Sequence, residues 1–207
     1  MKKTIFIDFD GTITKVDTCA AMVEAFAAEG WQEINDRWER KELSTVDCAN
    51  QTFALFHAGM EDITKLMESI EIDDFFIDFL HHCRELDYKV YVLSDGYDFC
   101  IEAVFRKYGL QVPYYSNKMM YNQGFQIECA HFNESCGNCG TCKTKLMTAL
   151  KEKGSETVYI GDGYSDTCPA VHADIVFAKG VLYNYCLAKG IKTIHYETFA
   201  DILAHIC

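Results

Sequence analysis

The sequence contains no apolar stretch of the roughly 18–20 residues that a membrane span needs. It is also poor in basic residues, with 19 Lys and Arg against 31 Asp and Glu, and its formal net charge is −12. That balance argues against nucleic acid or an anionic membrane surface as the main partner. Internal repeats and low-complexity linkers are missing too, and 207 residues fit one domain, with or without a smaller inserted module.

A recognisable export signal is missing as well. The opening letters Met-Lys-Lys-Thr-Ile-Phe-Ile lead to a charged residue, Asp8, after only a few apolar positions, and this pattern predicts a strand. We therefore expect a cytoplasmic, reducing environment in which most of the 11 cysteines are reduced, buried thiols. We also expect the protein to be a monomer or a homodimer.

Short apolar runs alternate along the chain with segments of helical periodicity. The runs predicted as strands are residues 4–9, 88–93 and 157–160, with weaker candidates at 174–177 and 191–194. The segments predicted as helices are residues 75–86, 98–108 and 143–152. This alternation favours a three-layer, Rossmann-like α/β fold, in which helices cover both faces of a parallel sheet. Ligands bind such sheets at the carboxyl ends of the strands.

Two segments depart from the alternation. Residues 15–72 have helical spacing and no convincing strand, so we expect a helical cap inserted into a core of residues 1–14 and 73–207. Residues 114–135 are rich in Tyr and Asn, and they fit either a β-hairpin or a long loop.

The first strand ends in the run Asp-Phe-Asp-Gly-Thr, which places Asp8 and Asp10 at positions i and i+2, on the same side of the strand. Phosphoryl transfer needs a nucleophile in line with the leaving group, a metal that neutralises the phosphate, and a proton donor. A pair of carboxylates can supply the first and last of these, and Gly11 lets backbone N–H groups approach a phosphate. On its own, the run also fits a strand end whose Asp10 or Thr12 caps the next helix.

A second polar turn follows the strand at 88–93. Here Ser94, Asp95 and Gly96 offer a hydroxyl group and successive backbone amides at the start of a predicted helix. Such a turn can hold a phosphate. It also fits a helix N-cap, and the two interpretations are compatible.

A lysine and a Gly-rich acidic turn complete the pattern. Lys143 and Lys145 are both candidates, and Lys143 is favoured because a helix that begins there directs Leu146, Met147 and Leu150 toward the core. After the strand at 157–160, the run Gly-Asp-Gly-Tyr-Ser-Asp contains Asp162 and Asp166. A few carboxylates of this kind, with phosphate oxygen and water, are the ligands that Mg²⁺ prefers.

These four motifs, in this order, resemble the signature of the haloacid dehalogenase superfamily, whose first motif reads Asp-x-Asp-x-Thr/Val. The resemblance implies a Mg²⁺-dependent phosphomonoester hydrolase that acts on a small phosphorylated metabolite through an aspartyl-phosphate intermediate. It implies that Asp8 is the nucleophile and a metal ligand. Asp10 would be the general acid and base, and would bind the metal through its backbone carbonyl.

The resemblance also assigns the other motif residues. Ser94 would bind the transferring phosphoryl group, with backbone groups of Asp95 and Gly96, and Lys143 would balance charge between nucleophile and phosphate. Asp162 would bind the metal directly and Asp166 through a metal-bound water, while Ser165 would contact the phosphate.

The helical insertion resembles the small cap of the phosphoserine-phosphatase-like branch. Within that branch the motifs are similar to a subgroup that contains 2-hydroxy-3-keto-5-methylthiopentenyl-1-phosphate phosphatases of methionine salvage and relatives of phosphocholine or phosphoethanolamine phosphatases. Asp17 falls where phosphoserine phosphatases carry a substrate-binding acid, although it also fits a helix N-cap. Gly11 and a Cys-rich loop depart from phosphoserine phosphatases.

That loop places Cys136, Cys139 and Cys142 at regular spacing, with Cys129 and His131 upstream. Cys-x-x-Cys pairs with glycine can hold a structural Zn²⁺, which would pin the loop that precedes Lys143, but a second, well-separated pair is lacking here. Reduced thiols packed against the sheet, or a disulfide, are the alternatives. Thiolates are poor ligands for Mg²⁺, so this metal would not be the catalytic one.

Two other functions stay open at this level. A phosphotransferase or mutase would use the same motifs and pass the phosphoryl group to a sugar instead of water. A non-catalytic, metal-binding regulatory protein could be built around the Cys-rich loop. The second is disfavoured because every predicted catalytic position holds the residue type that the chemistry needs.

Overall fold

The computed structural model describes residues 2–40, 42–137 and 139–206. Its strands form one sheet in the order β4-β3-β2-β1-β5-β6-β7, and every neighbouring pair is parallel except β3 and β4. The strands are β1 (Lys3–Ile7), β2 (Lys89–Tyr97), β3 (Tyr114–Tyr121), β4 (Phe125–Glu128), β5 (Glu156–Gly161), β6 (Ile175–Ala178) and β7 (Ile194–His195). A strand forms at each predicted place, although β7 overlaps its predicted range, 191–194, only at Ile194, and residues 114–128 form a hairpin rather than a long loop.

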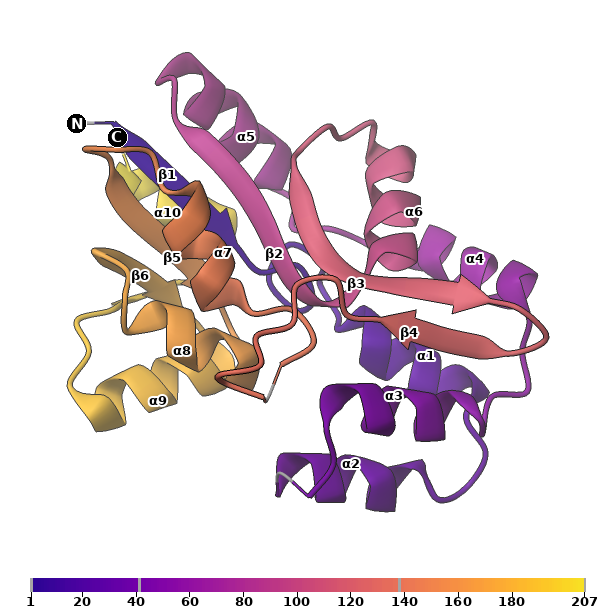
Figure 1. Cartoon of the computed structure of the whole chain (residues 1–207). Coiled ribbons are helices and arrows are strands. Elements are labelled where there is room, and N and C mark those ends of the chain that lie inside the picture. The colour runs from indigo at the N-terminus through magenta and orange to yellow at the C-terminus, as the bar shows by residue number, and fades with distance from the viewer. Residues whose placement is uncertain (1, 41, 138, 207) are drawn as a thin grey trace.

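Helices cover both faces of this sheet and give the three layers expected of the α/β fold (Figure 1). On one face lie α5 (Phe76–Glu85), α6 (Asp98–Tyr108) and α10 (Phe199–Ile206). On the other face lie α7 (Lys143–Leu150), α8 (Thr167–Ala170) and α9 (Gly180–Lys189). Among the described helices, none combines the length and the apolar character that a membrane crossing requires.

The central strand β1 shows why an uninterrupted apolar run becomes a strand here. Ile5 and Ile7 belong to the large core cluster on one face, whereas Phe6 belongs to a second cluster with Met147 and Tyr159 on the other. Successive side chains of a strand point to opposite faces, so a strand covered on both faces needs apolar residues at every position. The acidic residue that follows β1 then marks where the chain leaves the core.

The described residues of the predicted helical insertion, 15–40 and 42–72, form four helices. They are α1 (Thr18–Phe26), α2 (Trp31–Glu39), α3 (Thr45–Phe53) and α4 (Met60–Ser69). The chain enters and leaves this region through adjacent segments, because Thr14 and Ile72 form an antiparallel bridge and Asp73 N donates to Ile13 O at 2.8 Å. Helices α1, α2 and α3 lie beyond the carboxyl ends of β1 and β2 (Figure 1).

The C-terminal helix is held on the sheet by an aromatic cluster. The ring of Phe199 lies 4.9 Å from those of both Phe76 and Phe79, and all three side chains are fully buried. Because Phe199→Ala would leave a cavity between α5 and α10, we expect it to lower the free energy of unfolding by about 3–5 kcal/mol, measured by urea denaturation. Leu187→Ala on the exposed side of α9 is the control, with an expected change within about 0.5 kcal/mol. Equal effects of the two substitutions would contradict this account of the core.

Candidate active site

The polar turns predicted from the sequence lie next to one another. Asp8 follows β1, Ser94 lies in the last part of β2, and Asp162 follows β5. The sheet order places β1 between β2 and β5, and all three strands are parallel. Their carboxyl ends therefore meet at one edge, as expected for ligand sites of such sheets.

Lys143 lies at the centre of this group. Its Nζ is 2.7 Å from Asp8 Oδ1, 2.6 Å from Asp166 Oδ1 and 2.9 Å from Ser165 Oγ, and the residue is almost fully buried. Burial by itself would lower the pKa of Lys143, but the charges of Asp166 and Asp8 outweigh that effect and raise it. Three acceptors thus match the three hydrogens of a charged ammonium group. Lys145, the competing candidate, is exposed on the same helix.

Asp166 is bonded at both carboxylate oxygens. Its Oδ1 accepts from Lys143 and from the hydroxyl of Tyr159 at 2.6 Å, and its Oδ2 accepts from the N–H groups of Asp162 and Gly163. Although burial opposes it, the charge of Lys143 holds the pKa of Asp166 below its ordinary value. These bonds fix the short 3₁₀ turn η1 (Tyr164–Asp166) beneath the site. Sequence analysis had no means of identifying Tyr159, because a tyrosine in an apolar strand has the same pattern as any other core residue.

Asp8, Asp162 and Asp166 each bring an oxygen into a group whose members lie within 4.8 Å of one another. Three carboxylates against one ammonium leave two negative charges uncompensated, which is the charge of a divalent cation. Among the described residues, two groups donate hydrogen bonds to the carboxylate of Asp8, the backbone N–H of Phe9 and the ammonium of Lys143. Both donate to Oδ1. Oδ2 of Asp8 is thereby left available to a cation, and carboxylate oxygens suit Mg²⁺.

The same crowding changes the protonation of the acids. Burial and the charge of Asp166 raise the pKa of Asp8, and burial followed by Asp166 raises that of Asp162 to about 6, despite a hydrogen bond from Thr12. A bound cation would oppose both shifts by favouring the charged carboxylates.

Asp10 occupies a different environment on the loop after β1. Its Oδ1 accepts from Thr18 N at 3.0 Å and Thr18 Oγ1 at 2.5 Å, and its Oδ2 accepts from Ser94 Oγ at 3.1 Å. Burial, with a further contribution from Asp17, raises the pKa of Asp10 to about 6. A carboxyl group that titrates near neutral pH can both donate and accept a proton, as general acid–base chemistry requires.

The turn after β2 places Ser94 beside Asp10. Ser94 is fully buried, and its Oγ accepts from Gly96 N at 2.8 Å. A Cβ atom at Gly96 would lie 2.5 Å from Asp10 Oδ2, so this close approach needs glycine. The alternative that Ser94 caps the next helix is wrong, because the N-cap of α6 is Tyr97, which makes no side-chain cap bond.

Asp95, expected to lend backbone groups to a phosphate, directs its side chain elsewhere. Its Oδ1 accepts from Thr141 N at 2.8 Å and from Asn117 Nδ2 at 3.1 Å. Burial raises the pKa of Asp95, and these two hydrogen bonds oppose that rise. The carboxylate therefore belongs to a contact between β2 and the loop before α7.

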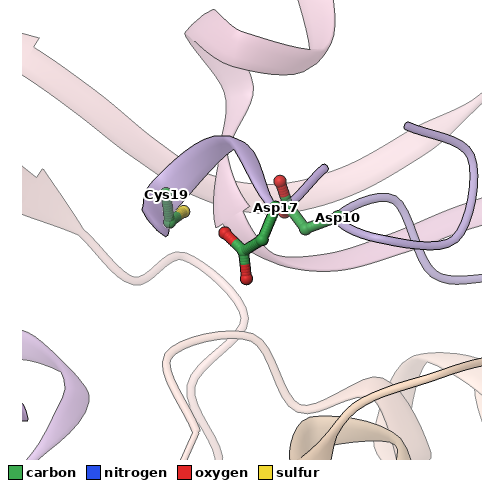
Figure 2. A group of neighbouring side chains, drawn as sticks. All are labelled: Asp10, Asp17 and Cys19. Carbon is green, nitrogen blue, oxygen red and sulfur yellow. The ribbon is translucent and has the colours of Figure 1, made fainter. Parts of the chain in front are cut away.

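Asp10, Asp17 and Cys19 form a second group of neighbouring ligand atoms at the start of α1 (Figure 2). Asp17 Oδ1 accepts from Ala20 N at 2.8 Å, so the predicted N-cap is confirmed, and Asp17 also lines the cavity above the site. Burial and the charge of Asp10 raise the pKa of Cys19 far above its ordinary value. A protonated thiol and two carboxylates already engaged in helix contacts give no reason to place a metal here.

A cavity of about 440 Å³ opens onto Asp8, Asp10 and Asp162. Much of its lining comes from the helical insertion and includes Trp31 and Trp38. Each charged residue among its described lining is acidic, and these are Asp8, Asp10, Asp17, Glu24, Glu39, Asp95 and Asp162. Another cavity, of about 590 Å³, lies near the amino end of β2 and includes none of the predicted site residues.

The predicted zinc site in the Cys-rich loop is not supported. Among the described side chains, the groups of three ligand atoms that gather within 4.8 Å are the two described above, and neither includes Cys129, Cys136, Cys139 or Cys142. Cys129, Cys139 and Cys142 carry free thiols. In the metal-free chain, burial raises the pKa of Cys129 to about 11 and that of Cys139 to about 12. The reduced-thiol alternative fits these three residues.

Comparison with known proteins extends the likeness over nearly the whole chain. Residues 3–201 match a family model described as "Putative Phosphatase". Two curated relatives, from Bacillus pumilus (strain SAFR-032) and Bacillus mycoides (strain KBAB4), are named 2-hydroxy-3-keto-5-methylthiopentenyl-1-phosphate phosphatase. The first is 33% identical, and the alignment covers 99% of this chain and 91% of the relative; the second is 32% identical, with 100% and 96% covered.

Solved structures share the fold at lower identity. One, titled "Phospho-Aspartyl Intermediate Analogue of Phosphoserine phosphatase", aligns with a TM-score of 0.71 and 21% identity over 99% of this chain and 98% of that chain. At this identity the likeness establishes the arrangement of the chain and leaves the substrate open.

The raised pKa of Asp162 leads to a stability test. Its pKa is about 6 in the folded chain against an ordinary 3.8, so the folded state holds this proton more tightly. The contribution of Asp162 to stability is therefore present below about pH 4 and is lost as pH rises through about 6. In chelator-treated protein, wild type should lose stability relative to Asp162→Asn over this range, measured by thermal unfolding.

Mg²⁺ should reverse that loss where Asp162 is charged. At pH 7.5 we expect millimolar Mg²⁺ to raise the Tm of wild type by about 5 °C, with little effect at pH 5 and none in Asp162→Asn. Asp36→Asn, at an exposed position of α2, should keep the full response. A Tm insensitive to Mg²⁺ at pH 7.5 would count against a metal site at these carboxylates.

Proposed function

The chain belongs to the Putative Phosphatase family of the haloacid dehalogenase superfamily, and from this premise we propose that it is a Mg²⁺-dependent phosphomonoester hydrolase that acts through Asp8. The observation that carries the proposal is the bonding of one buried lysine, Lys143, to Asp8 and Asp166 at the carboxyl ends of adjacent strands. The family resemblance inferred from the four motifs is confirmed by the relatives.

In this proposal Asp8 attacks the phosphorus atom and forms an aspartyl phosphate, while the ester oxygen leaves as an alcohol. Asp10, with its pKa raised to about 6, gives the proton to the leaving oxygen and later takes one from the attacking water. Ser94 holds a phosphoryl oxygen through its hydroxyl group, and Ser165 offers another. Lys143 places a positive charge next to Asp8, which reduces the repulsion between the Asp8 carboxylate and an approaching phosphate.

The residues that would hold Mg²⁺ are Asp8 and Asp162 through carboxylate oxygens, Asp10 through its backbone carbonyl, and Asp166 through water. When bound, the cation would neutralise charge on the phosphate. The fit rests on the two uncompensated negative charges of the carboxylate cluster. We propose further that residues 15–72 act as a cap that closes over the cavity and excludes water from the aspartyl phosphate.

The other functions considered from the sequence have less support. A regulatory protein built on a metal-binding Cys-rich loop has less support, because among the described residues the loop cysteines belong to no group of three converging ligand atoms. A phosphotransferase would use the same residues, and no observation favours it over hydrolysis. A cytoplasmic location and a monomeric or homodimeric state stay predictions.

The role of Asp8 has a direct test. Purified protein with Mg²⁺ should release phosphate from an aryl phosphate such as p-nitrophenyl phosphate. Asp8→Asn should lower kcat by about 10³-fold or more, because an amide is a poor nucleophile. Asp36→Asn, an exposed acid of α2, serves as the matched control and should keep wild-type turnover. Activity retained in Asp8→Asn would contradict the assignment of the nucleophile.

The cavity lining constrains the alcohol part of the substrate. Its described lining includes seven acidic residues, of which Asp95 turns its carboxylate toward Thr141 and Asn117, together with two tryptophans and no Lys, Arg or His. A second anionic group on the substrate would lose its hydration and find no counter-charge there. We therefore propose a small phosphate ester whose alcohol carries no anion. The substrate in the relatives' names, a methylthiopentenyl phosphate, has an alcohol part of this kind.

Phosphoserine and phosphoethanolamine test this selectivity, because they differ by a single carboxylate. We expect kcat/KM for phosphoethanolamine to exceed that for phosphoserine by about tenfold or more, measured by phosphate release. Substitution of Glu39, on the cavity wall, by Lys should narrow the ratio by improving phosphoserine turnover. A preference for phosphoserine in the wild-type protein would overturn the proposed substrate class.

A further inference from the structure

Lys143 is the first residue of α7, and it has to be placed accurately. The start of this helix is not fixed by a side-chain cap of its own. Nζ of Lys143 meets three acceptors at 2.6–2.9 Å, so a small shift of the first turn would break several of these contacts. The N-cap of α7 is Cys142, which makes no side-chain cap bond. The zinc ion that the sequence predicted in this loop is not supported. Other contacts must therefore fix the start of α7.

A buried polar network provides such contacts. Asp95 Oδ1 accepts from Thr141 N at 2.8 Å, two residues before Lys143. Asn117 Nδ2 donates to the backbone oxygen of Asp95 at 2.7 Å and to its Oδ1 at 3.1 Å. Thr141 Oγ1 donates to Asn117 Oδ1 at 3.2 Å, which completes a ring of bonds among three residues. The network joins the ends of β2 and β3 to the loop.

The loop is seated tightly on this network. Asn117 and Thr141 are fully buried, so each lost bond would leave a polar group without water. A Cβ atom at Gly140 would lie 2.5 Å from Asn117 Oδ1 and 2.8 Å from Cys129 Sγ, so the backbone passes directly over these side chains. The contact therefore combines hydrogen bonds with close packing, and it resists displacement of residues 140–142.

We propose that Asp95, Asn117 and Thr141 form a clamp that positions Lys143 between Asp8 and Asp166. Asp95 follows Ser94 directly, so one residue ties the hydroxyl proposed to hold the phosphoryl group to the loop that carries the lysine. These three are positioning residues, since their side chains act through the loop. The consequence for turnover rests on the proposed function, whereas the clamp itself does not.

An activity-independent measurement tests the clamp. Each lysine of the whole protein can be assayed with an amine-acylating reagent and peptide mass spectrometry. In wild type, Lys143 should react at least about tenfold more slowly than Lys145, which is exposed on the same helix. Asp95→Ala removes the acceptor of Thr141 N and should raise the Lys143 rate about tenfold, with Lys145 unchanged. Lys3, partly buried beside Glu156 on the far end of β1, reports any general loosening of the fold.

Milder variants keep the test valid if Asp95→Ala folds poorly. Thr141→Val removes one hydroxyl group at nearly constant volume and should raise the labelling of Lys143, whereas Thr141→Ser keeps the donor and should restore wild-type labelling. In the phosphatase assay, Thr141→Val and Asp95→Ala should lower kcat by about 10- to 100-fold and change KM by less than about threefold.

Wild-type labelling of Lys143 in both Asp95→Ala and Thr141→Val would overturn the proposal. An equal rise at Lys3 would also overturn it, because the network would then support the whole fold rather than one lysine. If the protein proved to release no phosphate from any ester, the proposed function would fail, and the labelling would still decide whether the clamp exists.

Discussion

The ammonium group of Lys143, held between the carboxylates of Asp8 and Asp166, is the interaction on which the rest of the site depends. All three side chains are buried, and a buried charge that loses its partner is strongly destabilising. β1, α7 and the η1 turn must therefore keep their relative positions whenever the chain is folded. The same arrangement leaves the cluster two charges negative when all three acids are ionised, and this excess of negative charge is the basis for the divalent cation that we propose there.

The sheet supplies the frame for this interaction. β1 is buried on both faces between β2 and β5, so its apolar residues fix its place and its carboxyl end carries Asp8 to the edge. The neighbouring strands β2 and β5 bring Ser94 and Asp162 to the same edge, although the two strands pair with β1 and not with each other. Glycines at 96 and 161 then allow carboxylates to approach the backbone, since a Cβ atom at either would lie within 2.6 Å of an aspartate oxygen.

Two features outside the reacting group shape what the site can do. The helical insertion contributes tryptophans and acids to the cavity lining. Among the described lining residues none is basic, so in the proposed reaction the alcohol part of the substrate meets no positive charge. On the opposite side, the hydrogen bonds among Asp95, Asn117 and Thr141 hold the loop before α7, and we propose that they do what a metal in the Cys-rich loop was expected to do.

The sequence by itself determined the α/β fold, the helical character of residues 15–72 and which polar residues the three strand ends carry, because local periodicity and residue type contain that information. Tertiary structure decided what depends on contacts between distant residues. The choice between Lys143 and Lys145 depended on tertiary structure, in which Lys143 bonds to Asp8, 135 residues away in the chain. Likewise, Asp95 turned out to bond to Thr141, 46 residues on, and the hydroxyl of Tyr159 to Asp166. Spacing cannot reveal such pairings, since the direction of a side chain in a loop is set by whichever element packs against it.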